Sequence, residues 1–432
     1  MSWIDKRVVI MGAARQGTAL ARYLAEKGAQ VTLTDMQSAE QLRLARESLA
    51  DLPIQWALGG HPLELLDETE LLCLSGGVPL TIPFVREAIW RGIPLSNDSQ
   101  VFMEAAPCKV VGITGSAGKT TTTTLVGRIA LQAERKGFYR KVYIGGNIGL
   151  PLISQVELMT ADDLAVVEFS SFQLELMTRS PQVAAVLNIS PNHLDRHKSM
   201  TAYIDAKKRI VVNQTSDDIS VLGWEDEEVR SWAEKAPGEA HFFGRQIPAD
   251  RMGSFIRDEA VWVRTSQEET QVLPLSEIAL RGDHNLLNVA AACAVGAALK
   301  LPPQVMQAGI AGFGGVEHRL EFVRHWGGAD WYNDSKATSP GMTVTAMRAF
   351  PERLVVLVGG RDKALPWDNF AAQAIKQADH VIAFGEAAGI VVSAIRAAVP
   401  EAEQPFELQI CTGLAEAVSA AAACVQAGHV VL

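Results

Sequence analysis

A glycine-rich turn in the first third of the chain has the residue types that bind a nucleotide phosphate. It follows an apolar run at 110–114, which predicts a buried strand, and it leads into a predicted helix over about 118–133. Glycines let backbone N–H groups wrap a phosphate, and the start of a helix adds favourable partial charge. Lys119 is predicted to reach the β- and γ-phosphates and Thr120 to bind Mg²⁺. Ile113 replaces the first glycine of the usual pattern, but the remaining turn still predicts phosphate binding by Gly115, Ser116, Ala117, Gly118, Lys119, Thr120 and Thr121.

Polar residues follow two further predicted strands. Glu168 and Asn188 each end a short apolar run, and His193 comes five residues after Asn188. Ligands of open parallel sheets bind outside the carboxyl ends of the strands. Glu168, Asn188 and Thr114 are therefore expected to lie close together beside the glycine-rich turn, which is a phosphate-binding loop (P-loop). Beside a P-loop, Glu168 is predicted to be a magnesium ligand, whereas His193 taken alone could equally be an ordinary loop histidine.

A predicted helix carries two adjacent lysines, Lys207 and Lys208, in the run from Tyr203 to Arg209. Taken alone, this run reads as a solvated basic face. Mg²⁺, however, needs hard oxygen ligands in near-octahedral geometry, and the region offers few acidic residues. The residues alone therefore do not explain why a lysine would lie near a magnesium site.

The elements that must position these residues alternate between strands and helices. Short apolar runs separated by amphipathic stretches indicate parallel sheets covered by helices, which is an α/β fold. A first such unit begins near residue 7, a second near 110, and a third after the glycines at 312–315. We expect three domains, over residues 1–102, 103–314 and 315–432.

The first unit contains a motif that could be misread. Gly12 and Gly17, with Asp35 eighteen residues further on, resemble a dinucleotide fingerprint, but Ala14 replaces the middle glycine. NAD requires close approach of the backbone at that position. The motif therefore indicates a nucleotide-like ligand and argues against NAD.

Composition limits the class of protein. Apolar residues make up 48% of the chain and charged residues 20%, as in a packed globular enzyme. A net charge of −10 argues against nucleic-acid binding, and no apolar run approaches the length of a membrane span. Five scattered cysteines without CxxC spacing fit free thiols in a reducing compartment. We expect a cytoplasmic enzyme that binds neither nucleic acid nor membrane.

Several runs together resemble the Mur ligases, the ATP-dependent amide ligases of peptidoglycan precursor synthesis. The resemblance spans most of the chain, and the motifs occur in the family's order. They are Gly115-Ser-Ala-Gly-Lys-Thr120, Gly145-Gly-Asn-Ile-Gly-Leu-Pro151, Glu168-Phe-Ser-Ser-Phe-Gln-Leu-Glu175, Asn188 through His193-Leu-Asp195, Gly282-Asp-His-Asn285, His318-Arg319 and Asn333-Asp-Ser-Lys-Ala-Thr338. The second-domain and third-domain runs have the form seen in the D-glutamate-adding branch of the family.

The resemblance implies a fold and a reaction. It implies a Rossmann-like UDP-binding domain, a P-loop ATPase-like central domain and a Rossmann-like C-terminal domain. It also implies that ATP drives the addition of D-glutamate to UDP-N-acetylmuramoyl-L-alanine through an acyl phosphate, in a monomer that uses two Mg²⁺ ions. Family members continue past the strand that begins at Gly428, so we expect the third domain to be truncated here.

The resemblance also implies roles for individual residues. Lys119 and Thr120 would hold ATP phosphates and the first Mg²⁺, and Glu168 and His193 would bind magnesium. Lys207, chosen over Lys208 by motif register only, would be carbamylated and hold the second Mg²⁺. The resemblance further implies that UDP is bound by Gly12, Gly17, Asp35 and Ser75, and that the muramoyl substrate is contacted by Asn147. ATP would also be bound by Asn285, Arg319, Asp334 and Lys336, and the amino acid by Thr338 and Lys363.

Three other interpretations remain open at this point. A folylpolyglutamate-type ligase shares the chemistry, but the N-terminal UDP-binding unit argues against it. A nucleotide-binding regulator without ligase activity and an NAD-dependent dehydrogenase are the alternatives from other classes. Release of ADP in the presence of the substrates, or a spectral change of NAD(H), would distinguish them.

Overall fold

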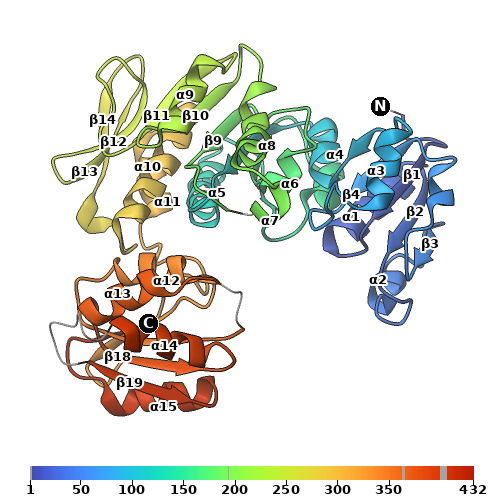
Figure 1. Cartoon of the computed structure of the whole chain (residues 1–432). Helices are drawn as coiled ribbons and strands as arrows, with labels where there is room; N and C mark the ends of the chain where they lie inside the picture. The colour runs from blue at the N-terminus through green and yellow to red at the C-terminus, as the bar shows by residue number, and fades with distance from the viewer. Residues whose placement is uncertain (1, 193, 362–364, 399–405) are drawn as a thin grey trace. The chain divides into compact units, whose positions relative to one another are not determined.

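The computed structural model describes residues 2–192, 194–361, 365–398 and 406–432. The chain forms two compact units (Figure 1). The first comprises the chain up to Leu275 together with Leu287–Ile310, and the second comprises Ser276–Leu286 together with Ala311–Leu432.

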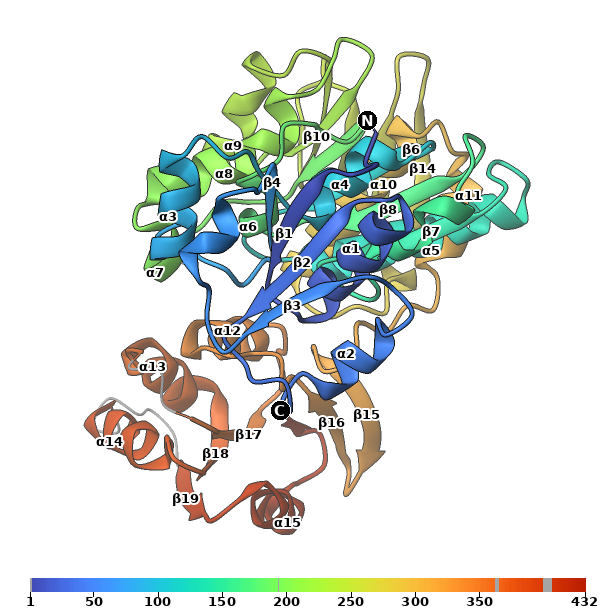
Figure 2. The same cartoon turned by 90° about the vertical axis from the view of Figure 1, so that its right-hand side faces the viewer.

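The first unit begins with a five-stranded parallel sheet in the order β3-β2-β1-β4-β5 (Figure 2). Helix α1 is amphipathic, and its Leu20 and Leu24 pack against Val8 and Val31 of the sheet. Because all the strands are parallel, their carboxyl ends lie at one edge. The elements are β1 (Arg7–Met11), α1 (Arg15–Glu26), β2 (Gln30–Asp35), α2 (Arg43–Ser48), β3 (Gln55–Leu58), η1 (Leu63–Leu66), β4 (Leu71–Leu74), α3 (Pro83–Trp90), β5 (Leu95–Ser96) and α4 (Asp98–Ala105).

The rest of the first unit contains a nine-stranded sheet in the order β14-β13-β12-β11-β10-β9-β6-β8-β7. Strands β6, β8 and β9 are buried along their whole length except for Lys109, as expected for strands covered on both faces. The strands are β6 (Lys109–Thr114), β7 (Val142–Gly146), β8 (Leu164–Glu168), β9 (Val183–Val186), β10 (Ile219–Gly223), β11 (Glu239–Phe243), β12 (Gly253–Arg257), β13 (Ala260–Arg264) and β14 (Glu269–Pro274).

Helices surround this second sheet. Helix α5 starts at the P-loop lysine and packs against α11. Helix α10 follows η4, and the stretch Ser276–Leu286, which includes most of η4 and the first turn of α10, belongs to the second unit. The helices are α5 (Lys119–Arg135), η2 (Leu152–Leu158), α6 (Ser171–Leu174), α7 (Leu194–His197), α8 (Met200–Val212), α9 (Glu227–Ser231), η3 (Trp232–Glu234), η4 (Leu275–Glu277), α10 (Asp283–Ala298) and α11 (Pro303–Ile310).

The second unit has a six-stranded sheet in the order β15-β16-β20-β17-β18-β19. Strand β20 lies between two strands that come much earlier in the chain, because Val430 pairs with both Asp330 and Leu354. A separate apolar core, which includes Phe350 and Phe370, fills this unit. Its elements are β15 (Glu321–Trp326), β16 (Ala329–Asn333), α12 (Pro340–Met347), β17 (Leu354–Gly359), α13 (Asp368–Gln377), β18 (Ala378–Phe384), α14 (Ala388–Ala398), β19 (Glu407–Cys411), α15 (Leu414–Cys424) and β20 (Val430–Val431).

The structure confirms the α/β architecture predicted from the sequence. The five cysteines are free, and four of them are buried, as expected for small apolar side chains. The alanine-rich helix α10 begins at Asp283. Asp283 lies in the first turn of that helix, where a negative charge is favourable.

Burial of Asp98 at the start of α4 predicts a pH-dependent cost in stability. Burial raises the pKa of this carboxyl from its ordinary 3.8 to about 6. Burial therefore disfavours the ionised carboxylate in the folded protein. The resulting decrease in the free energy of unfolding grows as the pH rises from about 4 to 6 and remains constant above pH 6. Chemical denaturation should show Asp98→Asn to be about 3 kcal/mol more stable than the parent at pH 8. At pH 4 the two should differ little; a constant difference across this range would contradict the assignment.

Candidate active site

The carboxyl ends of β6, β8 and β9 bring together the residues that the sequence predicted to converge. Ile113 is in register with Glu168, and Thr114 is in register with Val186, two residues before Asn188. The Asn188 side-chain oxygen accepts the N–H of Ala117 at 2.8 Å. Asn188 therefore holds the P-loop in shape.

The P-loop is tightly packed around its phosphate-binding backbone. Gly118 has φ +82°, and a Cβ atom there would lie 2.3 Å from the side-chain oxygen of Asn288, so glycine is required. Nζ of Lys119 donates to the carbonyl oxygens of Gly115 at 2.8 Å and Ser116 at 3.2 Å. The lysine thus lies over the loop that it is predicted to serve.

Lys207 lies against the same loop and is almost fully buried, with 1% of its surface exposed. Its Nζ donates to Oγ1 of Thr114 at 3.0 Å and to the carbonyl oxygen of Gly115 at 2.9 Å. Burial, reinforced by the charge of Lys119, holds the pKa of Lys207 well below its ordinary value. Lys208 instead lies over the ring of Trp232, 5.5 Å from its centroid. Of the two lysines, only Lys207 contacts the P-loop.

Glu168 is also buried, with 1% of its surface exposed. Its Oε1 accepts a hydrogen bond from the side-chain amide of Asn147 at 2.8 Å. Among the described residues, no hydrogen-bond donor reaches its Oε2. A buried carboxylate oxygen without a donor suits a divalent cation, which prefers hard oxygen ligands. The backbone N–H of Asn147 also donates to the Glu168 carbonyl at 2.9 Å, so the two side chains are fixed together.

Two predicted site residues, His193 and Lys363, lie outside the described residues. Within the part of the chain that is described, no three histidine, cysteine, aspartate or glutamate side chains cluster as a metal site would require. Among the described residues, a cation bound here would therefore rely on Glu168 together with hydroxyl or nucleotide oxygens.

Five predicted residues belong to the second unit: Asn285, Arg319, Asp334, Lys336 and Thr338. The turn before β15 and the turn after β16 meet there, because Asp334 accepts the N–H of Leu320 at 3.0 Å and the N–H of Lys336 donates to the His318 carbonyl at 3.0 Å. Burial raises the pKa of Asp334. Arg319, Asp334 and Lys336 are therefore brought together.

The other two residues of this group lie on separate elements of the second unit. Asn285, in the first turn of α10, donates from its side-chain amide to the carbonyl of Arg281 at 2.7 Å. Thr338 is exposed before α12.

The N-terminal motif also forms one cluster. Asp35 accepts the N–H groups of Ala13 at 2.7 Å and Gln37 at 2.9 Å, one on each carboxylate oxygen. Oγ of Ser75 donates to the Gly12 carbonyl at 3.0 Å. A Cβ at Gly17 would lie 1.8 Å from that same carbonyl oxygen, so the close turn requires glycine.

Two residues near these clusters were missed by the sequence analysis. His61 lies beside β2, with Nδ1 2.8 Å from Oγ1 of Thr34, and burial lowers its pKa. The hydroxyl of Tyr203 lies 2.8 Å from Oγ of Ser116 in the P-loop. Tyr203 precedes Lys207 by four residues and so shares its helix face, a spacing that could have identified it.

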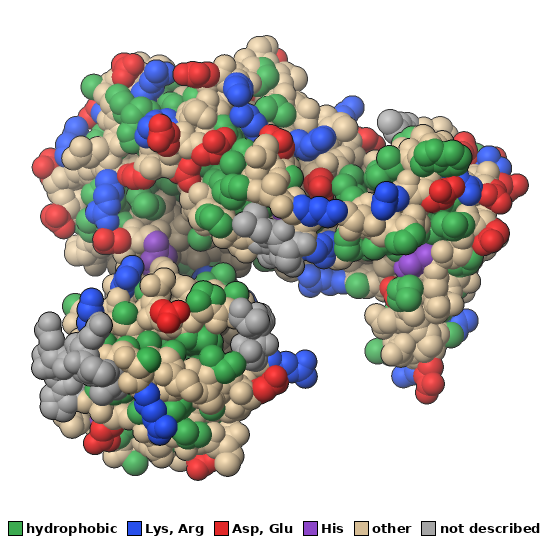
Figure 3. Space-filling model, viewed as in Figure 1, with side chains coloured by type: hydrophobic (Ala, Val, Ile, Leu, Met, Phe, Trp, Pro, Cys, Tyr) green, Lys and Arg blue, Asp and Glu red, His purple; other side chains and the backbone are tan. Residues whose placement is uncertain are grey.

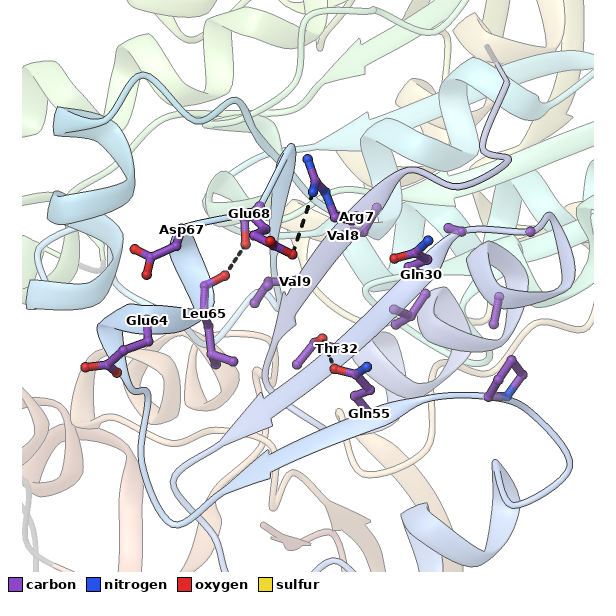
Figure 4. Close-up of a pocket in the computed structure, with 16 residues that line it drawn as sticks. Arg7, Val8, Val9, Gln30, Thr32, Gln55, Glu64, Leu65, Asp67 and Glu68 are labelled. Carbon is purple, nitrogen blue, oxygen red and sulfur yellow. Dashed lines mark hydrogen bonds and ion pairs between the residues drawn. The ribbon is translucent and has the colours of Figure 1, made fainter.

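A separate cavity of about 650 Å³ opens elsewhere in the N-terminal sheet (Figure 4). It is lined by the amino-terminal parts of β1 and β2 and by the segment after η1, where Arg7 pairs with Glu68 at 3.6 Å. Its lining contains none of Gly12, Gly17, Asp35 and Ser75. This cavity is therefore distinct from the predicted nucleotide site.

Acidic and basic side chains are interspersed on the face of the molecule shown in Figure 3. Across the described residues, every helix is too short or too polar to cross a lipid bilayer.

Three family domains match the chain in order. The Mur ligase MurD-like N-terminal domain matches residues 6–97, the Mur ligase middle domain matches 113–296, and the Mur ligase glutamate ligase domain matches 318–432. Together these matches include the P-loop, Glu168, Lys207 and the turn of Asp334.

Individual proteins give the same result. The chain is 40% identical to UDP-N-acetylmuramoylalanine–D-glutamate ligase of Symbiobacterium thermophilum over 91% of this chain and 86% of that protein. It is 34% identical to the enzyme of the same name from Acetivibrio thermocellus, over 99% and 91% respectively.

Solved structures show the same fold at lower identity. UDP-N-acetylmuramate-alanine ligase of Thermotoga maritima is 20% identical with a TM-score of 0.58, over 99% of this chain and 94% of that one. MurF ligase of the same organism, in complex with ADP, is 17% identical with a TM-score of 0.58, over 99% and 91%. Because these two relatives are 40% and 34% identical over at least nine-tenths of the chain, and the three domain matches follow one another along it, this chain belongs to the Mur ligase family.

Proposed function

We propose that this protein uses ATP to join D-glutamate to UDP-N-acetylmuramoyl-L-alanine, in the synthesis of peptidoglycan precursors. The observation that carries the proposal is the 40% identity, over 91% of the chain, to a ligase of that name. The geometry of the P-loop, Glu168 and Lys207 supports it, because these residues gather phosphate-binding and cation-binding groups at one sheet edge.

The first step is transfer of a phosphoryl group to the substrate. The carboxylate oxygen of the L-alanyl group attacks the γ-phosphorus of ATP, the bond to the β,γ-bridging oxygen breaks, and ADP leaves. Catalysis of this step depends on positioning and charge neutralisation. The P-loop backbone holds the phosphates, and Lys119 neutralises charge on the transferred group.

Mg²⁺ would offset the repulsion between the substrate carboxylate and the triphosphate. The residues present fit such an ion, because Glu168 has a buried oxygen without a donor among the described residues and Thr120 follows the P-loop lysine. We propose that Glu168 and Thr120 bind one ion, and that His193 with a modified Lys207 binds a second.

Lys207 is suited to carbamylation by its surroundings. Its amine contacts only neutral oxygens, those of Thr114 and Gly115, in its two hydrogen bonds. A neutral amine can attack the carbon of CO₂ and release a proton, which converts a cationic side chain into an anionic oxygen ligand. This change would supply the oxygen ligands that the acid-poor region lacks.

The second step forms the amide. The amine of D-glutamate attacks the carbonyl carbon of the acyl phosphate, a tetrahedral intermediate forms, and phosphate leaves as the amine loses a proton. We propose that Thr338 and Lys363 bind the incoming amino acid. Asn285, Arg319, Asp334 and Lys336 are proposed to bind ATP, with Arg319 on phosphate and Asp334 near the ribose, and Asn147 to contact the muramoyl substrate.

An ADP-release assay tests the proposed function. Release should require UDP-N-acetylmuramoyl-L-alanine and D-glutamate together, and L-glutamate or L-alanine should not replace D-glutamate. The proposal would be overturned if a folate substrate stimulated ADP release, or if ADP were released without any amino acid.

We further propose that Gly12, Gly17, Asp35 and Ser75 bind the UDP part of the substrate. Hydrogen exchange measured by mass spectrometry should show slower exchange of the peptides covering residues 12–17 and 35–37 when UDP is added. NAD should have no such effect, because Ala14 replaces the middle glycine of the NAD-binding fingerprint. Protection by NAD without protection by UDP would reverse the assignment.

The remaining expectations are proposals of the same kind. We propose that the protein acts as a cytoplasmic monomer, without nucleic-acid or membrane partners, and that its domains divide as 1–102, 103–314 and 315–432.

A further inference from the structure

A network of buried side chains joins α4, which follows the N-terminal sheet, to the short helix α6 that follows Glu168. Both helices are labelled in Figure 1. The side-chain amide of Asn97 donates to the carbonyl of Gln173 at 2.8 Å, and the side-chain amide of Gln173 donates to Oγ of Ser99 at 2.8 Å. Asn97, Ser99 and Gln173 are all less than 5% exposed. The network therefore lies in the interior, where hydrogen bonds are costly to lose.

Gln173 uses both ends of its amide. Its Oε1 accepts the N–H of Ser170 at 2.9 Å and the Ser170 hydroxyl at 3.0 Å, which completes a capping box at the start of α6. A glutamate could make the same capping contacts but could not donate to Ser99. The choice of glutamine is therefore explained by the bond to α4.

Helix α6 contacts the segments on either side of the predicted metal site. Ser170, its N-cap, comes two residues after Glu168. Oγ of Ser171 lies 2.9 Å from Nε2 of His197, and the ring of Phe172 stacks on His197 at 5.0 Å. His197 ends α7, which begins directly after His193. Contacts that hold α6 in place therefore also hold the segment of Glu168 and helix α7 in place.

We propose that Gln173 is a positioning residue, which anchors α6 to α4 and thereby holds Glu168 and α7 in the geometry that binds magnesium. This inference rests on the proposed function only in assigning Glu168 to the metal. It gives a physical role to a glutamine that the sequence analysis treated only as a family marker.

The test compares metal binding in Gln173→Ala with that in the parent. Mn²⁺, used in place of Mg²⁺, is titrated in the presence of ADP and the free ion is measured by electron paramagnetic resonance. The variant keeps the backbone carbonyl that Asn97 contacts but loses the bond to Ser99 and both capping-box bonds to Ser170. Loss of these three buried hydrogen bonds should weaken Mn²⁺ binding about tenfold. ADP binding without metal should be unchanged, because the P-loop is not part of the network.

Gln100→Ala is the matched control. Gln100 lies on α4 and is buried, with 4% of its surface exposed. Its side chain makes two hydrogen bonds across the same junction, because it donates to Oγ1 of Thr178 and accepts the Thr178 N–H, but Thr178 lies beyond the end of α6. This variant should lose thermal stability but keep Mn²⁺ affinity. Gln173→Glu, which can keep the capping box, should weaken Mn²⁺ binding through loss of the bond to Ser99.

The outcomes separate this inference from the proposed function. Unchanged Mn²⁺ binding in Gln173→Ala, or equal losses in Gln173→Ala and Gln100→Ala, would overturn the positioning role. If Gln173→Ala is too unstable to assay, Ser99→Ala, which leaves the capping box intact, is measured in its place. Failure of the parent to use D-glutamate would instead contradict the function and leave the metal comparison interpretable.

Discussion

Replacing Lys119 by alanine is expected to abolish turnover, with a loss of at least about a thousandfold in kcat. Its Nζ lies over the P-loop, 2.8 Å from the Gly115 carbonyl, where it would neutralise charge on the transferred phosphoryl group. Burial lowers the pKa of Lys207, the other lysine beside the loop, and so disfavours a positive charge there. Single-turnover measurement of acyl-phosphate formation from ATP isolates the affected step.

The Lys119 variant should remain folded, because the lysine is only partly buried and lies at the start of α5. Its unfolding midpoint should therefore stay within a few degrees of the parent. Substantial phosphate release by a folded Lys119→Ala protein would remove the basis for assigning this turn to ATP.

Lys207→Ala should be almost inactive, and a small carboxylic acid such as formate should partly restore activity by supplying the missing oxygens. The cavity left by a side chain that is 1% exposed provides room for such an acid beside Thr114. In the parent protein, ¹³C nuclear magnetic resonance after equilibration with labelled CO₂ should show one carbamate signal that is absent from the variant.

Lys208→Ala is the matched control for this prediction. It removes an adjacent lysine from the same helix, but one that lies over Trp232 and not beside the P-loop. It should keep both the carbamate signal and the activity. The assignment would be reversed by an inactive Lys208 variant together with a Lys207 variant that still carries the signal.

The local parts of the site could be predicted from the sequence. A buried strand, a glycine-rich turn and a helix are adjacent in the chain, so the P-loop residues are recognisable without tertiary information. The position of Glu168 followed from one rule, that the carboxyl ends of parallel strands meet at one edge. From the sequence, motif register alone favours Lys207 over Lys208. In the structure, Lys207 contacts the P-loop and Lys208 lies over the ring of Trp232.

Features that depend on distant segments could not be predicted. The bonds of Gln173 to Asn97 and Ser99 join residues more than 70 positions apart, and nothing in either run indicates its partner. The pairing of Asp35 with Ala13 depends in the same way on the relative placement of β1 and β2. Side-chain packing between elements decides such contacts, and local propensity carries no information about it.

The position of β20 has a consequence for how the protein is made. Its two residues separate β15 and β16 from β17, β18 and β19, and they pair with both groups. A ribosome releases the chain from the amino end, so the two groups emerge long before the strand that joins them. Until Val430 and Val431 leave the exit tunnel, the facing edges of β16 and β17 stay unpaired, and such edges recruit other chains. The second unit therefore completes its sheet late in translation, and the edges of β16 and β17 stay open to pairing with other chains until then.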